Sequence, residues 1–191
     1  HLAHRRQRQM CIRDSPEQLN TDEEIEFFKK AKPDIVVVVA YGKILPKKLL
    51  NIQDIKFINV HASLLPKWRG AAPIQRSIMN LDKETGISIM KIVSKLDAGP
   101  VMMKSKINLS KDDNYESVNK KLSILGAKMI VESLKLIEQN KSKFVEQDEN
   151  LASYAQKIDK SESEINWNEK AKKIIAKINA FYPSPGSWFK H

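Results

Sequence analysis

The sequence predicts an α/β fold in which helices pack on a mostly parallel sheet. The first observation is the run Ile35–Ala40, whose five consecutive β-branched residues are typical of a strand covered on both faces. A second, shorter strand is expected at Phe57–His61. The third observation is the segment Tyr115–Gln139, where apolar residues recur at helical spacing and predict the longest helix.

The other elements follow in chain order from local signals. Thr21–Glu24 is a capping-box pattern, which opens a helix that ends before Pro33. Leu45–Leu50 is expected to form a short helix entered through Pro46. The remaining elements expected are a helix at Ala71–Leu81, strands at Gly86–Val93 and Val101–Leu109, and a last helix at Asn168–Ala180.

Composition excludes several classes of protein. A length of 191 residues suits one domain with a fragment of a second. The single cysteine, Cys11, excludes disulfides within the chain and zinc sites built from cysteines. No apolar run approaches the ~20 residues that a membrane helix needs. The net charge of +10 suits a nucleic-acid partner or an ordinary solvated surface, and charge alone leaves both open.

The two ends of the chain read differently from its middle. Residues 1–15 carry four arginines against Asp14 alone and lack both apolar periodicity and a signal-peptide core, so we expect a foreign or mistranslated leader. The cluster Pro183–Gly186 is typical of a linker. We therefore divide the chain into a leader (1–15), a partial catalytic domain (16–142), a connector with the last helix (143–182) and the start of another domain (183–191). It is expected to be a piece of a larger protein.

Three polar residues form the candidate catalytic set. The period of two in the strand Phe57–His61 places Asn59 and His61 on the same side, at the end of the strand where open α/β sheets bind ligands. Asp97 lies in a separate turn, Leu96–Pro100. The other histidines lie at the chain ends, which argues against a cluster of histidine metal ligands.

The chemistry of this set suits transfer of an acyl or formyl group to an external amine. An imidazole titrates near neutral pH, a nearby carboxylate would orient it, and the amide of Asn59 can donate to a developing oxyanion. No Gly-x-Ser-x-Gly elbow surrounds Ser63. The alternative stays open that His61 is a hydrogen-bonded structural residue and that Asp97 only forms a turn.

Further motifs narrow the function only slightly. Neither a G-x-G-x-x-G dinucleotide fingerprint nor a P-loop is present. The segment Lys67–Gly70 joins a cation, an indole and a guanidinium, which suits contact with RNA by stacking and charge. Packing of the loop by Trp68 explains it equally well.

Together these residues resemble the methionyl-tRNA formyltransferases, a family within the formyltetrahydrofolate-dependent formyltransferase superfamily. The Asn59-x-His61…Asp97 set is shared by that superfamily and indicates the chemistry but not the acceptor, whereas Trp68–Arg76 is more specific to the tRNA enzymes. The matching segments are Pro33–Pro46, Ile58–Pro66, Lys67–Arg76, Glu84–Gly86 and Leu96–Pro100, with weaker similarity at Tyr154–Ile158, Ile165–Trp167 and Ala180–Pro183.

The resemblance implies a Rossmann-like catalytic domain and transfer of a formyl group from 10-formyltetrahydrofolate to the amino group of methionyl initiator tRNA. It implies a cytoplasmic monomer that uses no metal and no membrane. Asn59 and His61 would bind and polarise the formyl oxygen, while Asp97 would keep His61 charged or oriented and help to move protons. The residues expected to contact folate are Ser63, Leu64, Leu65 and Pro66, then Tyr41, Gly42, Ile44, Leu45, Ser94, Lys95 and Leu96.

The chain also departs from the family. The first βα unit and the C-terminal β-barrel beyond Pro183 are expected to be missing, which would leave an unpaired sheet edge. We therefore expect the chain alone to be poorly active and marginally stable. Two alternatives remain: a formyltransferase acting on a sugar nucleotide or another small molecule, and a non-catalytic fragment that binds folate or tRNA.

Overall fold

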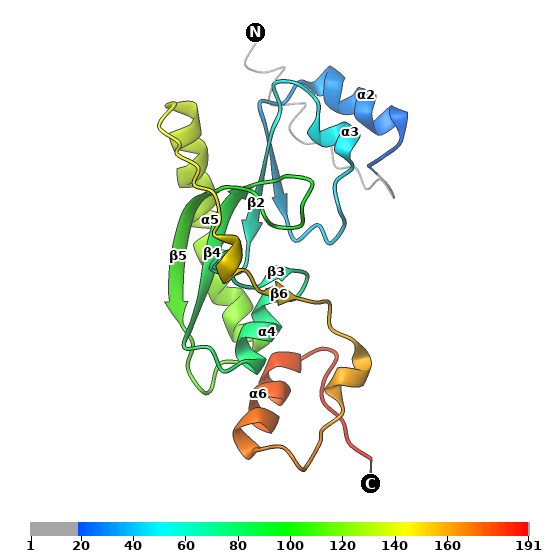
Figure 1. The fold of residues 1–191 in the computed structure, drawn as a ribbon, viewed down its shortest axis with the longest axis vertical. Coiled ribbons are helices and arrows are strands. Elements are labelled where there is room, and N and C mark those ends of the chain that lie inside the picture. The colour runs from blue at the N-terminus through cyan, green and yellow to red at the C-terminus, as the bar shows by residue number, and fades with distance from the viewer. Residues whose placement is uncertain (1–18, 191) are drawn as a thin grey trace.

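The computed structural model describes residues 19–190, so the expected leader, residues 1–15, lies outside the described residues. A four-stranded sheet occupies the middle of an elongated molecule, with helices at both ends and along one face (Figure 1). The elements are α2 (Asp22–Ala31), β1 (Ile35–Val39), α3 (Lys47–Leu50), β2 (Lys56–His61), β3 (Arg69–Gly70), α4 (Pro73–Met79), β4 (Glu84–Lys91), β5 (Val101–Asn108), α5 (Tyr115–Glu138), η1 (Glu149–Leu151), β6 (Tyr154–Ala155), η2 (Lys160–Ser163) and α6 (Ala171–Phe181).

The α/β class is confirmed, but the sheet is mixed rather than mostly parallel. Its order is β1-β2-β4-β5, and among the described strands of this sheet only β1 and β2 pair in parallel. β4 runs antiparallel to β2, and β5 runs antiparallel to β4. For β4 and β5 the reason is that no helix lies in the loop 92–100 between them, and a short connection returns the chain in the opposite direction.

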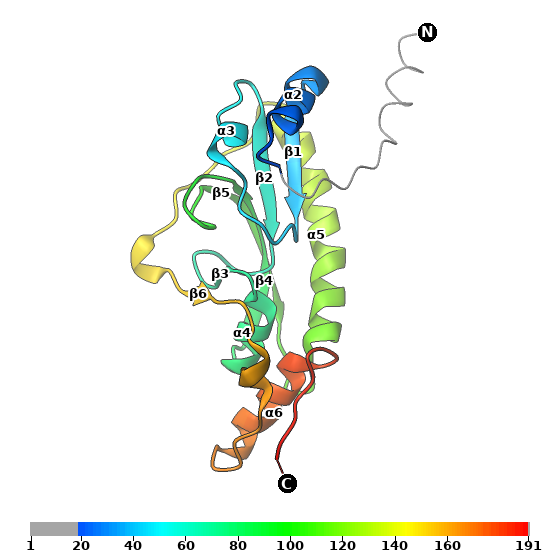
Figure 2. The same cartoon turned by 90° about the vertical axis from the view of Figure 1, so that its right-hand side faces the viewer.

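The two faces of the sheet are covered by different elements, as Figure 2 shows from the side. α5 lies along one face, where Val118, Leu122 and Met129 pack with residues of β4, α4 and α6 in the larger apolar core. On the opposite face Phe57 packs with Leu45 and residues from α2 and α3. The alternation along β2 therefore places Asn59 and His61 on the face opposite α5.

α2 begins at the signal that the sequence predicts. Thr21 is the N-cap of α2, and its side-chain oxygen accepts a hydrogen bond of 3.3 Å from the backbone N–H of Glu24. At the start of α5, Asn114 and Ser117 form a reciprocal capping box that the sequence analysis did not identify. The predicted apolar stripe of α5 is confirmed, since Val118, Leu122 and Met129 are all buried.

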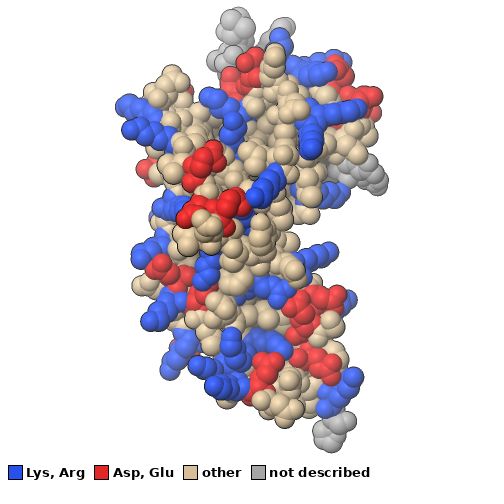
Figure 3. All heavy atoms as spheres, in the orientation of Figure 1, with Lys and Arg blue, Asp and Glu red and all other residues tan. Residues whose placement is uncertain are grey.

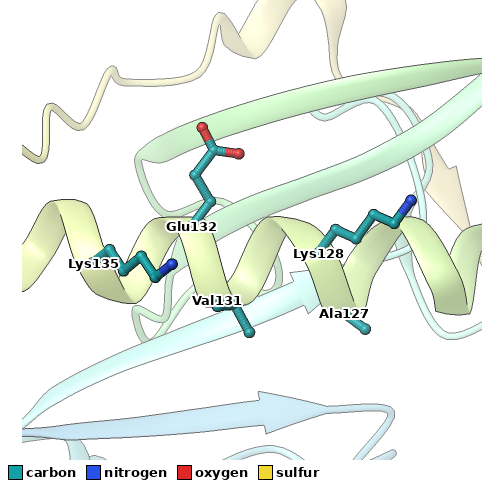
Figure 4. Close-up of a pocket in the computed structure, with 5 residues that line it drawn as sticks. All are labelled: Ala127, Lys128, Val131, Glu132 and Lys135. Atoms are coloured by element: carbon teal, nitrogen blue, oxygen red, sulfur yellow. The ribbon is translucent and has the colours of Figure 1, made fainter.

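The prediction that Ile35–Ala40 is covered on both faces is wrong for the part of the chain that the structure describes. Val37 and Val39 are 39% and 59% exposed, because β1 is an edge strand and α5 packs mainly on β4 and β5. A shallow depression on this side of α5 is lined by Ala127, Lys128, Val131, Glu132 and Lys135. Ala127 and Val131 point towards the side where β1 and β2 lie (Figure 4).

The positive charge is spread rather than concentrated. In Figure 3 lysine and arginine side chains occur from one end of the visible face to the other, interleaved with acidic ones. Several lysines belong to ion pairs, for example Lys106 with Glu84 and Lys121 with Asp113. Within residues 19–190 no helix is long and apolar enough to cross a membrane.

Candidate active site

Two loops and the end of β2 form the candidate site. β2 ends at His61, and the chain then turns through residues 62–68 to the short strand β3. The loop between β4 and β5 carries Asp97 to the same place, where its Oδ2 accepts a hydrogen bond of 2.8 Å from the N–H of Gly70. Asn59 and His61 are predicted to share one side of the strand. Asp97, which follows His61 by 36 residues in the chain, lies beside the ring of His61.

The imidazole of His61 is buried, and its two nitrogens have different partners. Nε2 lies 2.9 Å from the carbonyl oxygen of Trp68, which can only accept, so Nε2 carries a proton. Nδ1 lies 3.8 Å from Oδ2 of Asp97. In the neutral ring Nδ1 holds a lone pair, and when Nδ1 takes up a proton the ring forms an ion pair with Asp97.

The backbone of Asp97 is held in an unusual conformation. Its φ of +44° lies in the left-handed region, which is costly for a residue other than glycine. Two residues later Gly99 is buried so closely that a Cβ there would lie 1.9 Å from the carbonyl oxygen of Lys91. The loop that presents the carboxylate is therefore tightly packed rather than free to adjust.

The side chain of Asn59 is half-buried, and its amide group makes no hydrogen bond within residues 19–190. It precedes His61 by two residues on the same face of β2. Asn59 is therefore the member of the set whose donor remains available to an incoming group.

A polar network around the buried Arg69 lies beside Asp97 and was not predicted from the sequence. Arg69 is fully buried, and its guanidinium makes two hydrogen bonds to the Glu149 carboxylate at 3.0 and 3.1 Å. Burial alone would lower the pKa of Arg69, but hydrogen bonds with Glu149 and Tyr154 raise it. The hydrogen bonds from Arg69 and Lys95 lower the pKa of Glu149 to about 2.

Gln147 connects this network to the loop of Asp97. Its side-chain oxygen accepts hydrogen bonds from Arg69, and its side-chain nitrogen donates to the carbonyl oxygens of Asp97 and Gly99. Arg69 and Glu149 are 80 residues apart, so no local pattern in the sequence signals the network.

The predicted folate segment Ser63–Pro66 follows β2, and hydrogen bonds to its backbone hold it in place. The hydroxyl of Ser88 bridges it, donating to the carbonyl oxygen of Ser63 and accepting from the N–H of Leu65. The side chains of Ser63 and Leu65 are buried, whereas Leu64 and Pro66 are half-buried. This segment therefore offers a bound molecule its backbone and the side chains of Leu64 and Pro66.

The two other predicted folate segments differ in exposure. Tyr41 and Leu45 pack in the apolar cluster of Phe57, together with Ile92 at the start of the Asp97 loop. The structure thus brings Tyr41 and Leu45 into one apolar cluster with Ile92, two residues before Ser94. The remaining residues predicted there are exposed, namely Gly42, Ile44, Ser94, Lys95 and Leu96.

The structure favours packing over RNA contact for the segment Lys67–Gly70. The buried guanidinium of Arg69 is not available to a nucleic acid. The indole N–H of Trp68 donates to Asp82, which also pairs with Lys67. Among residues 19–190 no group of histidine, cysteine, aspartate and glutamate side chains is arranged to hold a metal ion.

Comparison with known proteins shows the family to which the chain belongs. A family model described as "Formyl transferase" matches residues 6–134, and one described as "Formyl transferase, C-terminal domain" matches residues 157–191. The chain belongs to the formyl transferase family.

Two relatives with curated names narrow the comparison within the family. A methionyl-tRNA formyltransferase of Pelagibacter ubique is 57% identical over 176 residues, which cover 92% of this chain and 57% of that protein. One of Dictyoglomus thermophilum is 50% identical over 175 residues, covering 90% of this chain and 55% of that protein. The chain therefore spans little more than half the length of these relatives.

Solved structures share the fold at low sequence identity. A sugar N-formyltransferase from a Shewanella species superposes with a TM-score of 0.78 at 17% identity, covering 91% of this chain and 71% of that one. HypX from Aquifex aeolicus, in complex with tetrahydrofolic acid, superposes with a TM-score of 0.76 at 18% identity. That match covers 87% of this chain and 29% of HypX.

Proposed function

We propose that this chain carries the catalytic residues of a methionyl-tRNA formyltransferase. The reaction moves a formyl group from 10-formyltetrahydrofolate to the α-amino group of methionine on initiator tRNA, in the cytoplasm. The observation that carries the proposal is the buried His61, whose Nδ1 faces Asp97 while its Nε2 is committed to a carbonyl oxygen. The two relatives named methionyl-tRNA formyltransferase support the choice of acceptor.

The proposed chemistry follows from the proton positions. The neutral amine attacks the formyl carbon, a C–N bond forms, and the carbonyl electron pair moves onto oxygen. The amide N–H of Asn59 donates to that oxyanion. The resemblance implies that His61 polarises the formyl oxygen, but its Nε2 is committed to the carbonyl oxygen of Trp68. We therefore propose instead that His61 takes the proton of the attacking amine at Nδ1, and that Asp97 stabilises the resulting imidazolium. Collapse of the intermediate breaks the bond to N10 of the folate, which receives the proton.

The folate is proposed to bind between the segments 41–45, 63–66 and 94–96. The side chains of Tyr41 and Leu64 are half-buried and would contact the pterin, while the bridged backbone of Ser63 and Leu65 would form one wall. We also retain the proposed division at residue 142, which falls between the two family-model matches, since these leave residues 135–156 uncovered. The second match runs from residue 157 to 191 and gives no support to a boundary at residue 182.

The experiment that tests this function compares acceptors. Because the chain spans 57% of the Pelagibacter relative, the assay uses the chain itself and a completed protein, in which the parts of that relative that the chain does not match are added. Each is incubated with 10-formyltetrahydrofolate and either methionyl initiator tRNA or a nucleotide-linked amino sugar. The completed protein is expected to transfer the formyl group to the tRNA alone, and the chain by itself to do so poorly. Transfer to the sugar alone would contradict the proposal and favour the small-molecule alternative, for which the Shewanella structure is a precedent in fold.

A further inference from the structure

Gln147 lies in the extended segment between α5 and η1 and makes four hydrogen bonds with its side chain. Its Oε1 accepts from Nε and Nη2 of Arg69 at 3.0 and 2.9 Å. Its Nε2 donates to the carbonyl oxygens of Asp97 and Gly99 at 2.9 and 2.7 Å. A primary amide has two donors and two acceptor positions, so the hydrogen-bonding capacity of Gln147 is fully used.

We propose that Gln147 is a positioning residue that holds the carboxylate of Asp97 against His61. This inference rests on the proposed function, because Asp97 and His61, which Gln147 would hold in position, are residues of that reaction. Asp97 needs such support because its φ of +44° is unfavourable for any residue other than glycine. By donating to the carbonyl oxygens on both sides of Ala98, Gln147 holds the backbone in this conformation.

Arg69 determines which way the amide of Gln147 points. A guanidinium can only donate, so Oε1 of Gln147 must face Arg69 and the NH₂ group must face the loop of Asp97. Arg69 is itself fixed, because it is fully buried, pairs with both oxygens of Glu149, and its backbone N–H donates to Ser153 at 2.8 Å. Arg69 thereby orients the amide of Gln147, and Gln147 holds the loop that carries the Asp97 carboxylate.

The network reaches the site a second time through β3. Gly70 directly follows Arg69, and its N–H donates to Oδ2 of Asp97 at 2.8 Å, the same oxygen that faces Nδ1 of His61. The backbone of Asp97 is thus held by Gln147 and its carboxylate by Gly70. Both contacts depend on the anchored Arg69.

Gln147→Glu separates positioning from simple packing. The glutamate keeps the shape of the side chain and still accepts from Arg69, but it has no N–H for the carbonyl oxygens of Asp97 and Gly99. Gln147→Met keeps the volume and removes both kinds of contact. Gln53→Glu, at an exposed position, is the matched control for the added charge.

The first readout is hydrogen exchange at the backbone N–H of Gly70, measured by NMR on the chain. Release of Asp97 should speed this exchange by about tenfold or more in both Gln147 variants and leave it unchanged in Gln53→Glu. The N–H of Arg69, which donates to Ser153, is the internal reference. Unchanged exchange at Gly70 in Gln147→Glu would overturn the inference.

The second readout is turnover of the completed protein. In Gln147→Glu we expect kcat to fall roughly 10- to 100-fold while KM for the folate changes by less than about threefold, because Gln147 contacts Asp97 and Gly99 and none of the residues proposed to bind the folate. If Gln147 only supports Arg69, Gln147→Glu should keep full activity, since a carboxylate pairs with arginine at least as well. A parent protein that transfers no formyl group refutes the proposed function, whereas an active parent with an unaffected Gln147→Glu variant refutes only the positioning role.

Discussion

Replacing Asp97 by asparagine removes one negative charge from the site with almost no change in shape. The oxygen of the new amide can still accept from the N–H of Gly70. What is lost is the attraction between the carboxylate and the imidazolium that forms when Nδ1 of His61 takes up a proton. The two atoms are 3.8 Å apart, and the side chains are 6% and 17% exposed. At an effective dielectric constant of about 20, this attraction is worth about 4 kcal/mol.

A loss of about 4 kcal/mol corresponds to a reduction in rate of roughly 10³-fold, and partial compensation by solvent brings the expected value to about 10²–10³ in kcat. The assay is single-turnover formyl transfer by the completed protein, with the affinity for the folate measured separately by fluorescence. The affinity for the folate should change by less than about threefold, because Asp97 is not among the residues proposed to contact the folate. Asp54→Asn, at an exposed turn, is the control. A decrease in kcat of less than tenfold in Asp97→Asn would refute the role of the ion pair.

Three further predictions concern stability. Because the pKa of Glu149 is lowered to about 2 by Arg69, this pair stabilises the fold above about pH 4.5 and loses its effect as the pH falls towards 2. The difference in Tm between the parent and Glu149→Gln should therefore narrow below about pH 4.5, and a difference independent of pH would contradict this. Leu49→Ala, at a fully buried position, should lower the free energy of unfolding in urea by about 2–5 kcal/mol, and a loss under about 1 kcal/mol would show that the site is loosely packed. Gly99→Ala should destabilise the chain more than Gly42→Ala in the same assay. A Cβ at Gly99 would lie 1.9 Å from the carbonyl oxygen of Lys91, whereas one at Gly42 meets nothing within 4 Å and carries only the backbone cost of a φ of +72°. Equal effects of the two glycine substitutions would contradict the close packing of the Asp97 loop.

The local features of the fold could be predicted because each depends on a few neighbouring residues. Thr21 caps α2 because its side chain reaches an N–H three residues ahead. The stripe of α5 is buried because the spacing of its apolar residues matches the helical repeat. Asn59 and His61 share a face of β2 because strand side chains alternate. Their catalytic roles, and the folate contacts, stay predictions.

The pairing of the strands could not be read in the same way. A β-branched run such as Ile35–Val39 indicates a strand, but it does not say which neighbours the strand has or what lies on its faces. Here β1 is at the edge of the described sheet, so Val37 and Val39 are exposed where coverage was expected. The direction of β4 and β5 likewise depends on where α4 packs and on the helix-free loop between the strands.

The hydrogen-bond network that supports the candidate site could not be predicted from the sequence either. Arg69 was interpreted as a possible RNA contact because it stands next to Trp68 and Lys67. Its partners Gln147 and Glu149 come from a segment about 80 residues later, where the local pattern is that of a connector. A buried arginine needs partners, but a single sequence does not say which residues supply them.

The central claim is that Asn59, His61 and Asp97 perform formyl transfer rather than merely shape a pocket. The most direct measurement is single-turnover transfer from 10-formyltetrahydrofolate to methionyl initiator tRNA by the completed protein and its Asn59→Ala and His61→Ala variants, with folate affinity measured on the same samples. The account predicts an active parent and a loss of at least about 10²-fold in the rate for each variant, with the affinity for folate kept within a few fold. Variants that transfer the formyl group at the rate of the parent, or that lose transfer only because they no longer bind folate, would contradict it.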